Sequence, residues 1–266
     1  MATAGTALAD DAAAAPTGPL RFTSLAADGA TSEVAAEFGI GVYDDVDENL
    51  LSARLSAQFM SPEHVGGYAH ITALSIDDTQ TLTNAELGGL YRAEGAQGAL
   101  TVRAGIVLPT GPGEDSGLDE AFLPLVHLAT RRPSDLADAG IDSTILRLGV
   151  SPSTQSGVVF ARADVGIDVF LDGPGSDTPD PLYHIDLAAG IKQGAAAGTI
   201  ELSSVGSTGT DDSDDGTFDA ITLGGQYDAG QATLGAGITL PFDTFDDSDG
   251  LGLSGKILSV SVAARM

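Results

Sequence analysis

The chain has 266 residues, of which 38 are Asp or Glu and 11 are Lys or Arg, so its formal net charge is −27. This charge argues against nucleic acid and anionic lipid surfaces as partners, because both are bound through clustered Lys and Arg. The absence of Cys excludes disulfides and thiolate metal sites. With 42% hydrophobic residues and a mean hydropathy of +0.13, the composition is that of a folded chain.

Residues 1–31 are predicted to form a flexible lead-in to a single domain over residues 32–266. The first ten residues lack a basic region and a full apolar core, yet Ala7-Leu8-Ala9 before Asp10 has the small-x-small form of a signal-peptidase site. Two interpretations stay open: the remnant of an export signal ending at about residue 9, or an Ala-rich tail. No run of about 18 apolar residues occurs, so no transmembrane helix is predicted.

From residue 32 onward, apolar and polar residues alternate with the period of two that is typical of a β-strand. In the first segment, one face carries Val34, Ala36, Phe38, Ile40 and Val42, and the other carries Glu33, Glu37, Gly39 and Gly41. Most segments have about 9–12 residues, the length that a tilted strand needs to cross a bilayer. The twelve predicted strands are 32–43, 49–60, 66–76, 82–92, 98–109, 142–151, 157–171, 182–193, 198–206, 217–228, 231–241 and 252–266.

The connections between these segments alternate as well, since every second one is short and the others are mostly long and acidic. The six acidic connections hold 23 of the 38 Asp and Glu residues. An even number of strands also returns both termini to the short-turn side. These features predict an all-β fold, a single antiparallel transmembrane β-barrel of about 12 strands. The acids expected to surround its wide mouth, as a vestibule, are Asp44, Asp45, Asp115, Asp211, Asp212, Asp214, Asp215, Asp246 and Asp247.

Aromatic residues are expected at the two water–lipid interfaces of such a barrel. Phe59, Tyr91 and Tyr227 fall on the apolar face at the short-turn end of their strands, and Tyr183 falls on that face at the opposite end. We predict that these four form a thin aromatic girdle, in a chain that has no Trp.

In this pattern the chain resembles the porin-like β-barrels of the Gram-negative outer membrane. Residues 258–266, apolar at every second position, resemble the C-terminal assembly signal of these proteins, although the chain ends in Met266 where the family usually has Phe or Trp. Residues 104–111, Ala-Gly-Ile-Val-Leu-Pro-Thr-Gly, also resemble a strand-exit motif of outer-membrane transporters associated with aromatic-compound degradation. The resemblance implies an outer-membrane location, short periplasmic turns, long extracellular loops, and contact of the last strand with the assembly machinery.

Part of the exit motif recurs, because residues 105–109 (Gly-Ile-Val-Leu-Pro) match residues 237–241 (Gly-Ile-Thr-Leu-Pro). Proline removes a ladder N–H, so Pro109 and Pro241 are each predicted to end a strand at the lipid border. A duplicated binding loop is the alternative.

The polar faces should line the interior of the barrel. Their many small residues, among them Gly88, Gly105, Gly166 and Gly190, favour an open lumen over a filled one. The charges of the wall are balanced, and they would either orient a polar solute or form ladder salt bridges. Lys256 lies two residues before Leu258 and therefore on the same, outer strand face, and we expect it at the lipid headgroups. The predicted lumen-lining residues are Glu37, Arg54, Glu86, Arg92, Arg103, Arg147, Arg162, Asp164, Asp168, His184, Asp186, Lys192 and Glu201.

Neither a cofactor nor a metal is expected. Asp211, Ser213, Asp215 and Gly216 follow the opening of a calcium loop, but the twelfth position is Thr222 instead of the bidentate Glu. The four His residues share no metal-ligand spacing. A Ser/His/acid triad converges only in space, so one sequence does not decide it, and we expect no enzyme.

We therefore predict an outer-membrane channel for passive diffusion of small polar solutes or ions, with mild cation preference arising from the acidic vestibule. One rival is a plugged structural or adhesive barrel, in which the connection 109–141 folds into the lumen and Arg131 and Arg132 pair with lumen acids. Another is a soluble, secreted acidic β-protein of a halophile. The expected partners are thus the lipid bilayer, small polar solutes or cations, and the assembly machinery, and nucleic acid is not expected.

Overall fold

The computed structural model describes residues 29–43, 50–76, 79–110, 135–136, 138, 143–173, 178–209, 217–243 and 255–266. Among these residues, no helix is long and apolar enough to cross a membrane. The strands are β1 (Glu33–Tyr43), β2 (Leu50–Met60), β3 (Val65–Ile76), β4 (Thr79–Leu82), β5 (Ala85–Gly95), β6 (Gly98–Leu108), β7 (Ile145–Ser156), β8 (Val159–Phe170), β9 (Leu182–Gln193), β10 (Ala196–Ser207), β11 (Thr217–Asp228), β12 (Ala232–Asp243) and β13 (Gly255–Arg265).

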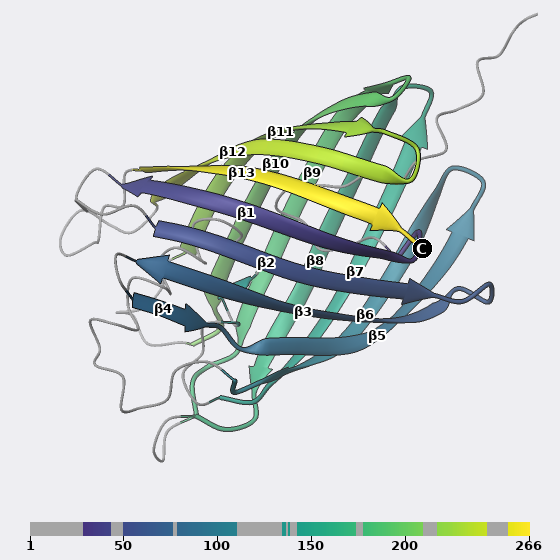
Figure 1. The fold of residues 1–266 in the computed structure, drawn as a ribbon. Helices are drawn as coiled ribbons and strands as arrows, with labels where there is room; N and C mark the ends of the chain where they lie inside the picture. Colours follow the sequence, from purple (N-terminus) through teal and green to yellow (C-terminus); the bar gives the residue numbers. More distant parts are fainter. Residues whose placement is uncertain are drawn as a thin grey trace, which may run out of the picture.

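The strands form one closed antiparallel barrel (Figure 1). Apart from β4 and β5, which both pair with β3, each strand pairs with its neighbours in the chain, and β1 closes the wall by pairing with β13 in the register Glu33↔Arg265 to Tyr43↔Gly255. The short β4 and the longer β5 follow one another along β3, so together they fill one position in the wall. The wall therefore has twelve strand positions, which confirms the predicted fold class.

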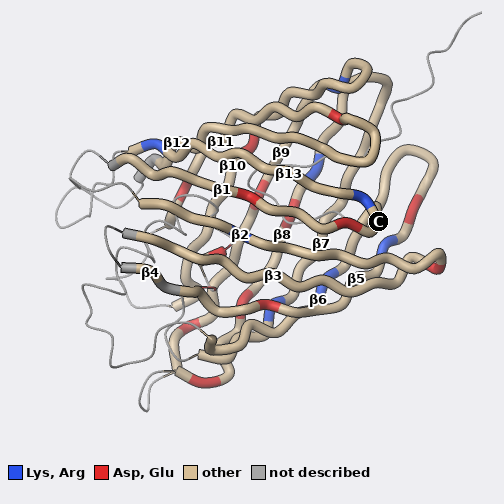
Figure 2. Tube along the Cα trace, viewed as in Figure 1, with Lys and Arg blue, Asp and Glu red and all other residues tan. Residues whose placement is uncertain are grey.

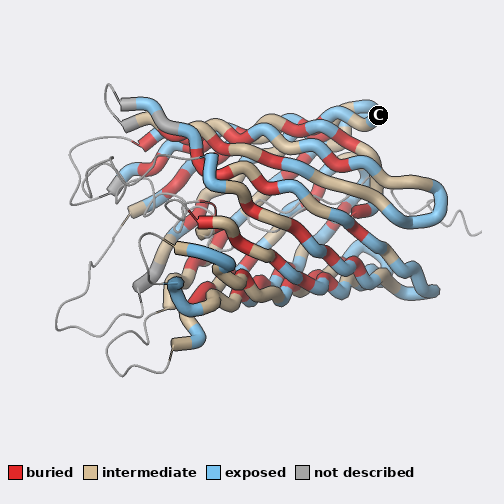
Figure 3. Tube along the Cα trace, turned by 90° about the horizontal axis from the view of Figure 1, so that it is seen from below, coloured by how far each residue is buried: buried red, intermediate tan, exposed pale blue. Residues whose placement is uncertain are grey.

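Exposure alternates along the strands, as a barrel with lipid outside requires (Figure 3). On β1 the side chains of Phe38 and Ile40 are 54% and 45% exposed, whereas Glu37 before them and Gly39 between them are buried. The outer face carries exposed Leu, Val, Ile and Phe on every wall position, and the inner face carries most of the buried polar and charged residues. This arrangement is the reverse of a soluble protein, because the hydrophobic surface faces outward.

The two ends of the barrel differ in the length of their connections. At the end that holds the C-terminus, the strands are joined by residues 61–64, 96–97, 157–158, 194–195 and 229–231. The turns at Gly157 and Gly194 are tight enough to require positive φ, 59° and 61°, which glycine adopts without strain. Most of the connections at the other end are longer, and the alternation predicted from the sequence is confirmed.

Two predictions are wrong at proline residues. The predicted strand 142–151 ends before Pro152, but β7 continues past it to Ser156, and the β7–β8 ladder skips from Val150↔Val165 to Ser153↔Arg162. Likewise Pro109 follows the end of β6, whereas Pro241 lies inside β12. Beyond Thr239, β12 pairs with β11 alone among the described residues, so Pro241 stands where one side of the strand has no described ladder partner and a missing N–H breaks no described ladder bond there.

The residues just before β1 lie inside the mouth of the barrel. Gly29 N–H donates to Gln58 Oε1 at 3.2 Å, and Gln58 Nε2 donates to the carbonyl of Thr31 at 2.6 Å. A Cβ built on Gly29 would lie 3.4 Å from Thr101 Cγ2, which belongs to the inner face of β6. Gln58 is on β2 and Thr101 is on β6, which are not neighbouring strands. Residues 29–31 therefore extend from one part of the wall to another at the short-turn end of the barrel. The rest of the predicted lead-in, residues 1–28, lies outside the described residues.

The closed ladder leads to a simple solution test. A barrel without free edges resists detergent until it is heated, so we expect the unheated protein to migrate differently from the boiled protein on a detergent gel. It should also require detergent for extraction from membranes. A chain that stays in solution without detergent and shows one mobility at all temperatures would instead be the soluble β-protein.

Candidate functional site

Charged residues of both signs occur along the strands (Figure 2), and most of those on the strands are buried on the inner face of the wall. Every residue predicted to line the lumen is buried on the inner face of its strand, except for Arg92, whose side chain is 13% exposed and pairs with Glu94. Such burial inside a barrel means that other protein atoms, rather than a wide water-filled space, cover these side chains. Lys256 is exposed on the outer face of β13.

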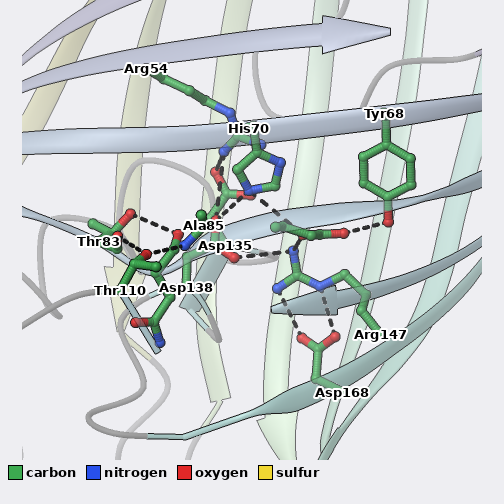
Figure 4. Close-up of polar contacts among 12 residues, drawn as sticks. Arg54, Tyr68, His70, Thr83, Ala85, Thr110, Asp135, Asp138, Arg147 and Asp168 are labelled. Carbon is green, nitrogen blue, oxygen red and sulfur yellow. Dashed lines mark hydrogen bonds and ion pairs between the residues drawn. The ribbon is translucent and has the colours of Figure 1, made fainter. Parts of the chain in front are cut away.

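Arg147 of β7 is the centre of the largest buried ion-pair network (Figure 4). Its Nε and Nη2 atoms donate to the two carboxylate oxygens of Asp168 on β8, at 2.8 and 3.2 Å. Its Nη1 atom donates to Glu86 of β5, which also accepts a hydrogen bond from the hydroxyl of Tyr68 on β3. Arg147 and Asp168 are direct cross-strand partners, and the planar guanidinium can therefore bind that carboxylate through two parallel bonds.

Two acids of the long connection between β6 and β7 enter the same network. Asp135 accepts a hydrogen bond from Arg54 of β2, and both side chains are almost completely buried. Asp138 is 0% exposed; one of its carboxylate oxygens lies 2.7 Å from His70 Nε2 on β3 and the other 3.3 Å from Arg147 Nη1. This part of the connection is therefore inside the barrel, bound to three strands of the wall (Figure 4).

The inserted segment hydrogen-bonds to the backbone at the break between β4 and β5. At Thr83 and Asn84 the chain leaves the ladder, and the freed N–H of Asn84 donates to the carbonyl of Asp138 at 2.9 Å. Thr110, just after β6, closes the same corner, because its hydroxyl accepts from the N–H of Ala85 at 2.8 Å and donates to the carbonyl of Thr83 at 3.2 Å. The sequence predicted one unbroken strand over 82–92; the break exists because the backbone there hydrogen-bonds to the inserted segment.

A second ion-pair group lies on β6 to β8. Asp164 accepts hydrogen bonds from Arg103 and from Arg162, the latter at 3.0 Å, and Arg162 also donates to Ser151 Oγ at 3.3 Å. Asp186 of β9 stands directly opposite Asp164 in the ladder. The wall charges thus form cross-strand salt bridges, which is the second of the two roles considered from the sequence.

The prediction that the inward glycines leave open space is wrong at four positions. A Cβ on Gly88 or Gly105 would lie within 2.6 Å of Tyr68 atoms, because the Tyr68 ring lies over both residues. The His184 ring covers Gly166 in the same way, and the Phe160 ring covers Gly190. Glycine here makes room for a large side chain on the neighbouring strand, so the lumen is narrower than a count of small residues suggests.

The remaining predicted sites are placed as follows. Phe59, Tyr91 and Tyr227 are 63%, 53% and 56% exposed on the outer face, and Tyr183 is half-buried over Gly206 on that face. His184 is buried, and its ring nitrogens have no hydrogen-bond partner among the described residues. Arg131, Arg132 and all nine vestibule acids, from Asp44 to Asp247, lie outside the described residues, as does the calcium-like run from Asp211.

Three side chains of the network form a group that could hold a metal ion. Ligand atoms of His70, Glu86 and Asp138 all lie within 4.8 Å of one another. None of the three was singled out as a ligand from the sequence. Glu86 was predicted to face the lumen, but His70 lies in one of the least regular segments, and Asp138 lies in a connection without periodicity.

No protein-family model and no curated protein sequence matches the chain. The fold, however, is similar to that of solved outer-membrane channels. The COG4313 outer-membrane channel from Pseudomonas putida F1 superposes with a TM-score of 0.63 at 12% identity, over 94% of this chain and 99% of that one. The KdgM porin in complex with disordered oligogalacturonate gives 0.56 at 6% identity (87% and 99%), and the NanC porin gives 0.54 at 12% (88% and 100%).

The chain therefore has the fold of an outer-membrane porin-like β-barrel. A closed barrel with an apolar outer face is the form in which β-strands cross a lipid bilayer. These similarities in fold are consistent with the outer-membrane location that the sequence predicts.

Proposed function

We propose that the protein is a passive channel for small polar solutes or ions. The observation that carries this proposal is a closed barrel whose interior is polar and whose exterior is apolar. A barrel of twelve strands lies between those whose side chains fill the interior and those with a wide aqueous pore. Solutes that can hydrogen-bond with Arg, Asp, Thr and Ser side chains are therefore the class that fits it.

We further propose that the channel prefers cations mildly. The connections at one end hold 23 acids, and an acidic mouth attracts cations and repels anions over about one Debye length. Inside, ion pairs join Arg54 and Arg147 to four carboxylates, so these two arginines add no excess of positive charge there. We place these acidic connections outside the cell and the short turns in the periplasm, where the last strand would meet the assembly machinery.

Planar-bilayer recording with a salt gradient tests both statements. We expect single-channel steps with a reversal potential of the sign that marks cation preference, and this potential should shrink as the salt concentration rises. Anion preference would contradict the vestibule, and a membrane that stays silent with heat-modifiable, inserted protein would contradict the channel.

A closed barrel with a structural role is the second candidate, and the inserted acids Asp135 and Asp138 favour it. They bind the wall through Arg54, His70 and Arg147, whereas the rival derived from the sequence used Arg131 and Arg132. Our proposal includes no catalysis. His70 binds Asp138, and among the described residues neither the His70 ring nor the His184 ring forms a hydrogen bond with a serine hydroxyl.

A further inference from the structure

Among the described residues, carboxylates outnumber guanidiniums in the network around Arg147. Its described carboxylates are Glu86, Asp135, Asp138 and Asp168, and its described guanidiniums are Arg54 and Arg147. All of these side chains are at most 8% exposed. A buried charge without compensation is costly, and it attracts a cation that can reach it.

Two of these carboxylates lie next to an imidazole. His70 Nε2 is 2.7 Å from Asp138 Oδ2 and 3.6 Å from Glu86 Oε2. Two atoms bound to one tetrahedral zinc at about 2.1 Å lie about 3.4 Å apart, so the Glu86 distance already fits and the Asp138 oxygen must move by less than 1 Å. Asp138 is on a connection rather than a strand, which makes that movement the easiest in the group.

Arg147 contacts two of the three candidate ligands. Its Nη1 atom donates to Glu86 Oε2, so a bound metal would have to displace the guanidinium from that oxygen. It approaches Asp138 through Oδ1, which accepts no hydrogen bond among the described residues. The Asp138 oxygen on His70 is the other one, Oδ2. Near this corner, Thr72 on the inner face of β3 is 0% exposed, and its hydroxyl has no hydrogen-bond partner among the residues described.

We propose that His70, Glu86 and Asp138 bind one first-row divalent cation of the zinc type. A ligand set with one imidazole and two carboxylates selects zinc, cobalt or nickel over calcium and magnesium, which prefer oxygen ligands only. Because Asp138 belongs to the inserted connection and the other two ligands belong to the wall, the metal ties the connection to β3 and β5 and narrows the channel.

Binding is tested by calorimetry of the folded protein in detergent, with Zn²⁺ as the probe and with Co²⁺ for its visible spectrum. We expect one tight site per chain in the parent protein. His70→Ala should weaken it by at least about tenfold, and Asp138→Asn, which leaves the wall strands unchanged, should do the same. The matched control is His184→Ala, which removes another buried inner-face imidazole and should keep the site.

Zinc binding that is equal in His70→Ala, Asp138→Asn and the parent would overturn the proposal, because the ions would then be held by the acidic connections. The absence of any tight site would overturn it as well. Neither readout requires a conducting pore, so a failure of the metal site and a failure of the proposed channel can be told apart. In a conducting preparation, micromolar Zn²⁺ should reduce the current of the parent and leave that of His70→Ala unchanged.

Discussion

Replacing Arg147 by Met should be among the most destabilising single changes in the barrel. The substitution leaves the carboxylates of Asp168, Glu86 and Asp138 inside the wall without the guanidinium that contacts all three. Removal of one partner from a buried pair typically costs about 3–5 kcal/mol, since the remaining charges stay buried. We expect a loss of that order in the free energy of unfolding, measured by urea titration in lipid vesicles.

Arg92→Met is the matched control, because it removes an arginine of the same inner face whose partner Glu94 is 54% exposed. An ion pair open to water is worth about 1 kcal/mol or less, so this variant should be close to the parent protein. Arg147→Lys should fall between the two, since an ammonium keeps the charge but loses the fork that binds Asp168 at two points. Equal stability of the Met variants would mean that water, rather than Arg147, solvates the three carboxylates.

The wall of the barrel could be predicted because the face of a strand residue is a local property. Parity alone places Arg54 and Asp168 inside and Phe59 and Leu258 outside, and the structure agrees for all four. Proline was less informative, because its effect depends on the partner strand. Pro241 is tolerated within β12 only where β13 no longer pairs, and a single strand read alone does not reveal this.

The contents of the lumen could not be predicted in the same way. Whether Gly105 leaves space depends on the register that brings the Tyr68 ring over it, and register is a relation between strands. The contact of Arg54 with Asp135 spans 81 residues, and Asp135 lies in a connection where no period assigns an orientation. The charge pattern of that connection indicated insertion through its arginines, whereas its described contacts with the wall are made by its acids.

The inserted segment leads to the second large effect. Asp135→Asn together with Asp138→Asn should release the connection from the wall, because both charge-assisted contacts with arginines and the contact with His70 are lost. Water can then solvate Arg54 and Arg147. We expect the single-channel conductance of the double variant to rise by about twofold or more as the cross-section opens.

The control for charge is Asp211→Asn with Asp212→Asn, which changes the net charge by the same amount in a different acidic connection. This pair should lower the cation preference at low salt and leave the conductance at high salt unchanged, because screening removes the effect of vestibule charge but not that of a plug. If both double variants behave alike at high salt, then the inserted acids only tune the electrostatics. If only Asp135→Asn/Asp138→Asn conducts better at high salt, the inserted segment limits the pore physically. If the parent protein does not conduct and this double variant does, the parent is the closed barrel of the second candidate.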